Sequence, residues 1–197
     1  PEFRNEWWYV TGNLADAAGR PFGYQLTISR IALSSAAPPV DSPWRANQVY
    51  MGHFALTDVA GNRHHGFERF SRGALGLAGA RAAPFRVWLE DWALTGAETD
   101  VFPLRIRAQE GDIAIDLTLD AGKPVVLQGD QGLSQKSAEP GNASYYYSQT
   151  RMPTQGTVRV GGRSFTVSGA SWLDREWSTS ALGPDQSGWD WFALQLD

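Results

Sequence analysis

Cysteine is absent from this chain of 197 residues, and it has no long apolar run and few lysines. The lack of cysteine excludes disulfides, thiolate metal sites and a cysteine nucleophile. No apolar run approaches the roughly 18–20 residues that a membrane-spanning helix needs. The net charge is −4 and the basic residues are scattered, so we expect neither a nucleic-acid-binding surface nor an anionic-membrane surface.

Glycine, tryptophan and alternating patterns are plentiful instead. The 21 Gly and 9 Trp are typical of a turn-rich β protein. Strict alternation in Asp112–Asp120 predicts a strand with one apolar face, and the paired glycines in Arg159–Phe165 predict a tight hairpin. Roughly ten strands at hairpin spacing favour an all-β fold, either an up-and-down barrel or a sandwich. Only Phe70–Arg81 is predicted as a short helix or compact loop.

Two charged residues fall on otherwise apolar strand faces. Glu6 alternates with Trp8 and Val10, and Arg30 shares a face with Leu26 and Ile28. Because an isolated buried charge costs several kcal/mol, we expect Glu6 and Arg30 to pair with each other on adjacent strands. Such a pair would be either a structural closure of a barrel end or a polar clamp inside a ligand cavity.

Asp190 is predicted to share an apolar strand face with Phe192 and Leu194, and its segment has no obvious basic neighbour. A carboxyl buried among aromatic rings without a partner tends to stay protonated and can donate a proton. The alternative is a carboxylate that accepts backbone hydrogen bonds where a loop meets a strand. Asp190 is therefore a candidate general acid.

A second acidic pair lies in Trp172–Ser178, where alternation puts Asp174 and Glu176 on one face. Paired carboxylates suit acid–base chemistry because each raises the proton affinity of the other. They are also typical of a solvated edge strand. In the neighbouring run Tyr145-Tyr146-Tyr147, at least one ring should point inward, where it could hold a substrate or an acid.

Other motifs give little support for a defined chemistry. His64 and His65 follow a polar turn, and His53 alternates with apolar neighbours, so a half-buried histidine is favoured over a metal ligand. The sequence lacks a G-x-S-x-G nucleophile elbow, a P-loop and a G-x-G-x-x-G fingerprint. We therefore expect neither a metal nor a cofactor.

Four motifs together carry a family resemblance. The segment Pro1–Leu14 with its Glu-Trp-Trp-Tyr core, Gly23–Thr27, Trp172–Ser178 and Gly188–Phe192 resemble the AttH/CrtC family. That family includes carotenoid 1,2-hydratase (hydroxyneurosporene synthase) and many proteins described as predicted secreted hydrolases. The similarity runs from the first residue to the last. The Trp-Leu-Asp-Arg-Glu-Trp form of the third motif is more similar to the AttH branch than to the carotenoid-modifying branch.

The resemblance implies a lipocalin-like (calycin) antiparallel β-barrel that binds an apolar molecule. Residues 1–187 would form this N-terminal barrel, and 188–197 would be a strand leading into a second lipocalin-like domain, its partner within the same protein. It also implies an exported protein of a Gram-negative bacterium, periplasmic or secreted, whose signal peptide has been removed. Members of its hydratase branch are thought to protonate an isoprenoid double bond and then add water.

Carried onto this sequence, the resemblance makes Asp190 the acid and Asp174 or Glu176 the base or orienting group. The candidate ligand-binding residues are Trp8, Tyr24, Arg30, Tyr146, Trp172, Trp177, Trp189 and Trp191. The leading hypothesis is a domain that binds a hydrophobic small molecule, with acid-assisted hydration or hydrolysis. The alternatives are a non-catalytic carrier and a carbohydrate-binding or carbohydrate-active domain, since tryptophan platforms and paired acids also suit sugars.

Overall fold

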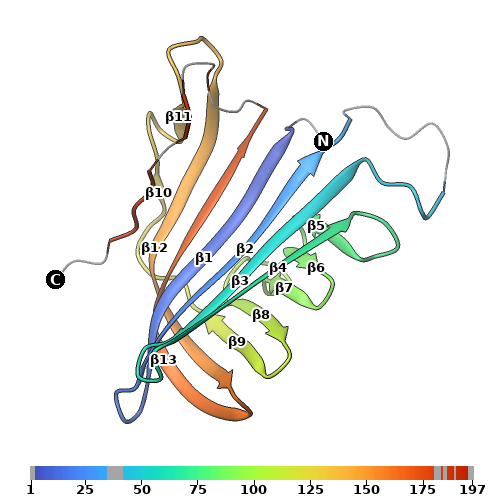
Figure 1. Cartoon of the computed structure of the whole chain (residues 1–197). Coiled ribbons are helices and arrows are strands. Elements are labelled where there is room, and N and C mark those ends of the chain that lie inside the picture. Colours follow the sequence, from blue (N-terminus) through green and yellow to red (C-terminus); the bar gives the residue numbers. More distant parts are fainter. Residues whose placement is uncertain (1–2, 35–41, 180–182, 184–185, 189, 195–197) are drawn as a thin grey trace.

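Antiparallel strands make up all of the regular structure in the described residues. The structure is a computed structural model that describes residues 3–34, 42–179, 183, 186–188 and 190–194 (Figure 1). Its strands are β1 (Asn5–Asp16), β2 (Pro21–Ala32), β3 (Gln48–Asp58), β4 (Arg63–Arg72), β5 (Ala78–Arg81), β6 (Arg86–Leu89), β7 (Trp92–Thr95), β8 (Leu104–Glu110), β9 (Ile113–Leu119), β10 (Val126–Leu127), β11 (Leu133–Gln135), β12 (Ala143–Val160) and β13 (Arg163–Ser178).

These strands form one curved sheet in the order β4-β3-β2-β1-β13-β12-β9-β8-β7-β6-β5. The long strands β1–β4, β12 and β13 make one wall, and the short strands β5–β9 curl against its lower part (Figure 1). Strand β9 pairs with β12 only over Thr154–Arg159, whereas the other end of β12 pairs with β10 and β11. The upper part of the long strands therefore extends beyond the short ones. This architecture is the all-β antiparallel barrel that the resemblance implies.

Alternation gives the sheet an inner and an outer face. In β1, Trp8, Val10 and Leu14 are buried in the core, while Tyr9 and Thr11 lie on the opposite, outer face and are half-buried. The predicted strand alternation is confirmed in β9, where all four apolar residues of one face are buried: Ile113, Ile115, Leu117 and Leu119.

The predicted glycine hairpin is also confirmed. Val160 pairs with Arg163, and the two residues between them, Gly161 and Gly162, have φ angles of 57° and 75°. Both angles lie in the left-handed region that a two-residue hairpin turn of this type requires and that glycine adopts at little cost.

The structure corrects or narrows three expectations. The sheet has 13 strands rather than roughly ten, because the short pieces β5–β7, β10 and β11 give weak alternation signals. Of the two alternatives for Phe70–Arg81, the structure has the compact loop and no helix: β4 ends within this segment, a turn follows, and β5 begins at Ala78. In 188–197, the described residues contain no strand, since they have no paired strand in this chain.

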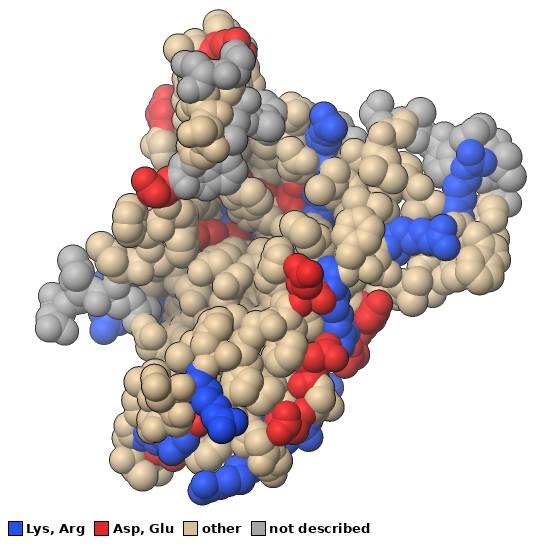
Figure 2. All heavy atoms as spheres, in the orientation of Figure 1, with Lys and Arg blue, Asp and Glu red and all other residues tan. Residues whose placement is uncertain are grey.

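Charged side chains form mixed groups rather than a patch of one sign (Figure 2). Arg69, for example, makes ion pairs with Glu90 at 3.4 Å and Glu110 at 2.8 Å, and a third with Asp91. In the parts of the chain that the structure describes, no helix is long and apolar enough to cross a membrane.

Candidate functional site

Strand β13 carries two clusters of polar residues, one on each face of the sheet. Asp174 and Glu176 point to the outer face, and Arg175 between them points to the inner face. We define the outer acid cluster as Asp174 and Glu176 with Ser144, Ser148 and Lys136. The inner charge cluster consists of Glu6, Arg30 and Arg175. Figure 2 shows acidic side chains set back in a hollow in the upper half of the molecule.

Asp174 is the most deeply buried carboxylate of the outer acid cluster, with 2% of its surface exposed. One carboxyl oxygen, Oδ1, accepts a hydrogen bond from Ser148, whose Oγ in turn accepts one from Gln128 at 2.9 Å. The other oxygen, Oδ2, is buried and has no hydrogen-bond partner among the described residues. Burial raises the pKa of Asp174 above its ordinary value, although the hydrogen bond from Ser148 and the nearby donors of Trp172 and Tyr146 act in the opposite direction. Asp174 is therefore suited to hold a proton.

Glu176 lies two residues further along the same face, but its charge is compensated. Its Oε1 is 2.7 Å from Lys136 Nζ and accepts a hydrogen bond from Ser144. Lys136 directly follows β11, and its ammonium lies 5.4 Å from the ring centroid of Tyr146. Glu176 thus ties the β11 segment onto the outer face, which favours a structural role over an acid–base one.

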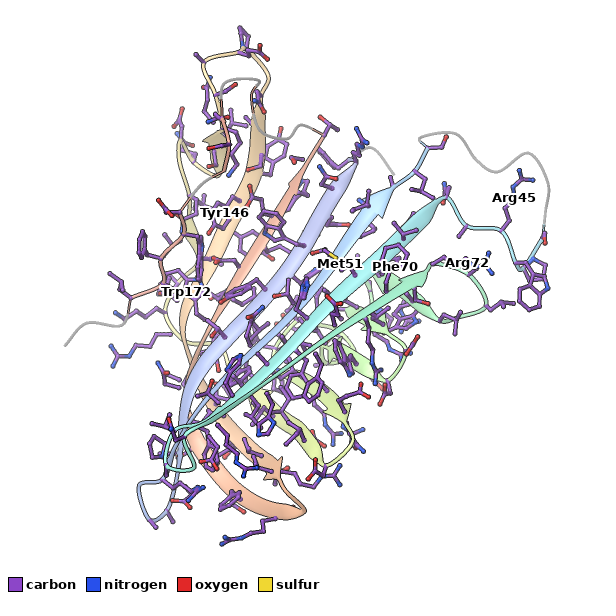
Figure 3. The ribbon with its side chains drawn as sticks, in the orientation of Figure 1. Arg45, Met51, Phe70, Arg72, Tyr146 and Trp172 are labelled. Carbon is purple, nitrogen blue, oxygen red and sulfur yellow. The ribbon has the colours of Figure 1, made fainter. Side chains whose placement is uncertain are left out.

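Beside Asp174 lies a small aromatic hollow of about 250 Å³. Its lining consists of Tyr9, Thr11, Gly12, Asn13, Trp172, Trp191 and Ala193. Tyr9 is the register partner of Asp174 across β1 and β13, so the acid is adjacent to the hollow rather than far from it. Figure 3 shows Tyr146 and Trp172 on the side of β12 and β13 along which the C-terminal segment runs.

Trp191 brings the C-terminal segment onto this hollow. Its ring packs edge-on against Tyr9 with 4.9 Å between the ring centroids, and its indole N–H donates to the hydroxyl of Tyr146 at 3.2 Å. Burial raises the pKa of Tyr146 to about 12, so this hydroxyl stays protonated at neutral pH. Three aromatic side chains thus line the hollow, and Tyr146 and Asp174, whose pKa values are raised by burial, lie beside it.

A larger hollow of about 350 Å³ lies between β8, β9 and β12. Its lining includes Asp116, which is already paired with Arg105 at 2.8 Å and with Arg107 at 2.9 Å. These carboxylate oxygens are occupied by guanidinium groups at the surface, so this larger hollow offers no uncommitted acid.

On the inner face, the predicted pairing of Glu6 with Arg30 is confirmed by a distance of 2.7 Å. Arg175 makes a second ion pair with the same carboxylate. Its guanidinium lies between two indoles, 4.4 Å from the ring centroid of Trp8 and 4.8 Å from that of Trp177. Arg175 was not among the predicted site residues, although its alternation with Leu173 and Trp177 places it on the apolar face.

The other proposed site residues lie apart from the Asp174 hollow. Asp190 is exposed and belongs to no strand, so the prediction that it is buried on a strand face is wrong for the described part of the chain. Burial without a basic partner is found at Asp174 instead. Tyr24 is in the core, where its hydroxyl and Ser171 Oγ are 2.6 Å apart. Trp189 lies outside the described residues.

The three histidines do not form a metal site. His64 Nδ1 lies 2.9 Å from Thr57 Oγ1 on the exposed outer face of β3 and β4, and His53 is half-buried on the same face. Within the described ranges, no group of three or more His, Asp or Glu side chains is arranged to hold a metal ion.

The structure is thus a nearly closed antiparallel β-barrel with a buried acid beside an aromatic hollow. The AttH-like family model matches residues 1–197, and the chain belongs to this family. A solved structure assigned as an AttH protein of Nitrosomonas europaea is 35% identical with a TM-score of 0.78, and the match covers 93% of this chain and 54% of that one.

A second solved structure shares the fold at low identity. Kievitone hydratase from Nectria haematococca is 15% identical with a TM-score of 0.66, and the match covers 91% of this chain and 49% of that one. The chain therefore spans about half the length of both solved structures. The comparison with curated proteins gave no match.

Proposed function

We propose that this chain contributes to an enzyme that binds an apolar, isoprenoid- or lipid-like molecule beside Asp174 and hydrates or hydrolyses it. One observation carries the proposal. Asp174 is buried without a basic partner, its pKa is raised by burial, and it adjoins the hollow lined by Tyr9, Trp172 and Trp191. A carboxyl whose pKa is raised and that lies beside aromatic rings is what general-acid chemistry requires.

For hydration, the protonated carboxyl of Asp174 donates its proton to one carbon of a double bond and leaves a carbocation on the other. Aromatic faces stabilise such a cation, and Tyr9 and Trp191 supply them at this place. A water oxygen then bonds to the cationic carbon, and the carboxylate takes back one of the water protons. The net change is one water added across the double bond, with the acid restored.

The comparisons support hydration as the first reaction to test. Kievitone hydratase is named for a hydration, but at 15% identity it shares only the fold with this chain. The chain also spans about half of that protein, so the activity of the whole protein is part of the proposal.

A substrate that carries both reactive groups distinguishes the two reactions. Geranyl acetate contains isoprenoid double bonds and an ester, and incubation in ¹⁸O-labelled water followed by mass spectrometry separates added water from released geraniol. We expect Asp174→Asn to lower turnover by about a hundredfold or more, the range that a general acid contributes. Asp116→Asn is the matched control, because it removes a surface carboxylate that is paired with arginines.

Asp190→Asn tests the acid favoured by the sequence alone. A large loss in Asp190→Asn with full activity in Asp174→Asn would reject the assignment to Asp174. Saturable binding of geranyl acetate without turnover in any form would favour the non-catalytic carrier. The ion pair between Glu176 and Lys136 is the observation that favours this second candidate, since it leaves only one of the two acids uncommitted.

A further inference from the structure

The inner charge cluster contains one carboxylate and two guanidinium groups. Glu6 uses both of its oxygens: Oε2 accepts from Arg30 Nε at 2.7 Å, and Oε1 is paired with Arg175 Nη2. One negative charge therefore faces two positive charges. The side chains are 5% exposed for Arg30, 15% for Arg175 and 18% for Glu6, so water screens this imbalance only in part.

Arg30 also carries a buried donor that nothing satisfies. Its Nη2 donates to the backbone carbonyl of Phe3 at 3.0 Å, but its Nη1 is buried and has no hydrogen-bond partner among the described residues. Buried polar groups are almost always hydrogen-bonded, and an unsatisfied charged donor is more costly than a neutral one. The cluster thus lacks one acceptor and one negative charge at the same place.

Aromatic side chains surround the charge cluster. Arg175 lies between Trp8 and Trp177, and the Trp177 ring stacks on Tyr145 with 5.7 Å between the ring centroids. Burial lowers the pKa of Arg175 and the nearby charge of Arg30 adds a little in the same direction, whereas the ion pair with Glu6 raises it. Tyr145 is 48% exposed, so the aromatic wall reaches from the buried charges to solvent.

The cluster lies at the upper ends of the long strands. Glu6 is near the start of β1, Arg30 near the end of β2 and Arg175 near the end of β13 (Figure 1). A pure structural closure would need one arginine for one carboxylate. The second guanidinium and the unsatisfied Nη1 are what a binding site for an anion provides.

We propose that Arg30 and Arg175 bind the carboxylate, or a similarly small oxyanion group, of an amphipathic molecule whose apolar part lies along Trp177 and Tyr145. The bound anion supplies the missing acceptor for Arg30 Nη1 and balances the second guanidinium. Because Arg175 and Asp174 are consecutive in β13, this site is on the opposite face of the sheet from the proposed acid. It therefore does not depend on the proposed function of Asp174.

Matched twelve-carbon probes test the proposal by isothermal titration. Laurate has the anionic group and the apolar chain, dodecan-1-ol has only the chain, and acetate has only the anion. We expect laurate to bind about tenfold or more tightly than dodecan-1-ol, since a charge-assisted hydrogen bond contributes about 1.5–3 kcal/mol. Acetate should bind far more weakly than laurate. Equal affinities for laurate and dodecan-1-ol, equal affinities for laurate and acetate, or no saturable binding of laurate would overturn the proposal.

Two variants and one control assign the effect to the cluster. Arg175→Gln should reduce the affinity for laurate to that for dodecan-1-ol, whereas Glu6→Gln should tighten laurate binding because it removes the internal competitor. Arg63→Gln removes the same charge from an exposed position at the other end of the sheet and should change nothing. An equal loss in Arg63→Gln and Arg175→Gln would reject the site. Near-ultraviolet circular dichroism checks folding, and if Arg175→Gln is unfolded, the three-probe comparison on the unmodified chain decides.

Discussion

Asp174 and Arg175 are neighbours in sequence but lie on opposite faces of β13, and their charges are accommodated differently on the two faces. Arg175 keeps its charge through an ion pair with Glu6 and lies between two indoles that hold it in place. Asp174 has no basic partner among the described residues, and burial raises its pKa, which favours the neutral form. Pairing and neutralisation are the two ways in which a protein avoids an isolated buried charge.

The difference shows which groups are free to react. An arginine in an ion pair and between two aromatic rings cannot easily change its protonation state, but it can recognise an anion. A protonated carboxyl beside a hollow can give up its proton. The two proposals follow this difference: charge recognition is proposed for the inner face and proton transfer for the outer face, and each can be tested separately.

The largest expected effect comes from two consecutive tryptophans. Trp8→Ala should lower the free energy of unfolding by about 3–5 kcal/mol, because Trp8 is 3% exposed in the core and supports Arg175. Trp7→Ala on the half-buried outer face is the matched control and should cost less than half as much. Urea unfolding followed by far-ultraviolet circular dichroism measures both. Equal losses would mean that the two faces do not differ in burial as described.

A smaller effect separates the paired from the unpaired carboxyl. Glu6→Gln leaves two largely buried guanidinium groups without their carboxylate, so it should lower the free energy of unfolding by roughly 3 kcal/mol. Asp174→Asn removes no ion pair and keeps the shape of the side chain, so at neutral pH it should have little effect or be slightly stabilising. The same unfolding measurement serves for both variants. A loss at Asp174→Asn that matches Glu6→Gln would show that Asp174 is ionised and has a strong partner.

Local patterns were enough to predict the all-β class and much of the inner face, whereas the barrel was predicted from the family resemblance. Alternation over a single strand placed Glu6 and Arg30 on apolar faces, and their opposite charges made the pair an economical solution. Paired glycines at Gly161 and Gly162 predicted the hairpin because few other residues adopt that turn. These features depend on a residue and its near neighbours, so the sequence alone carries them.

The parts that sequence reasoning missed depend on contacts between distant segments. Arg175 forms its ion pair with Glu6, which is 169 positions away in the sequence, because β1 pairs with β13. The sequence also does not tell Asp174 from Asp190, since both are acids among tryptophans. The two acids differ in burial. Ser148 of β12 and Trp172 of β13 lie against Asp174, whereas Asp190 is exposed on a segment that belongs to no strand.

The smallest expected effect is a pH dependence whose sign differs between two aspartates. The pKa of Asp174 is raised above its ordinary 3.8, so the folded chain holds more protons than the unfolded one as the pH rises from that value to the raised pKa. Its contribution to stability is therefore present at low pH and declines through this window. The hydrogen bonds and charges of Arg105 and Arg107 lower the pKa of Asp116, so its contribution is present above 3.8 and declines as the pH falls through its lowered pKa.

Unfolding in urea across a pH series measures both signs on the same molecule. Asp174→Asn should remove part of the decline in the free energy of unfolding between about pH 4 and neutrality, and Asp116→Asn should leave that decline intact. Asp116→Asn should instead remove part of the loss on the acid side. If the decline above about pH 4 is the same in Asp174→Asn as in the unmodified chain, Asp174 is ionised like an ordinary carboxylate. Asp174 on the outer face would then be charged, like Arg175 on the inner face. That result would reject both the proposed role of Asp174 as an acid and the contrast between the two faces.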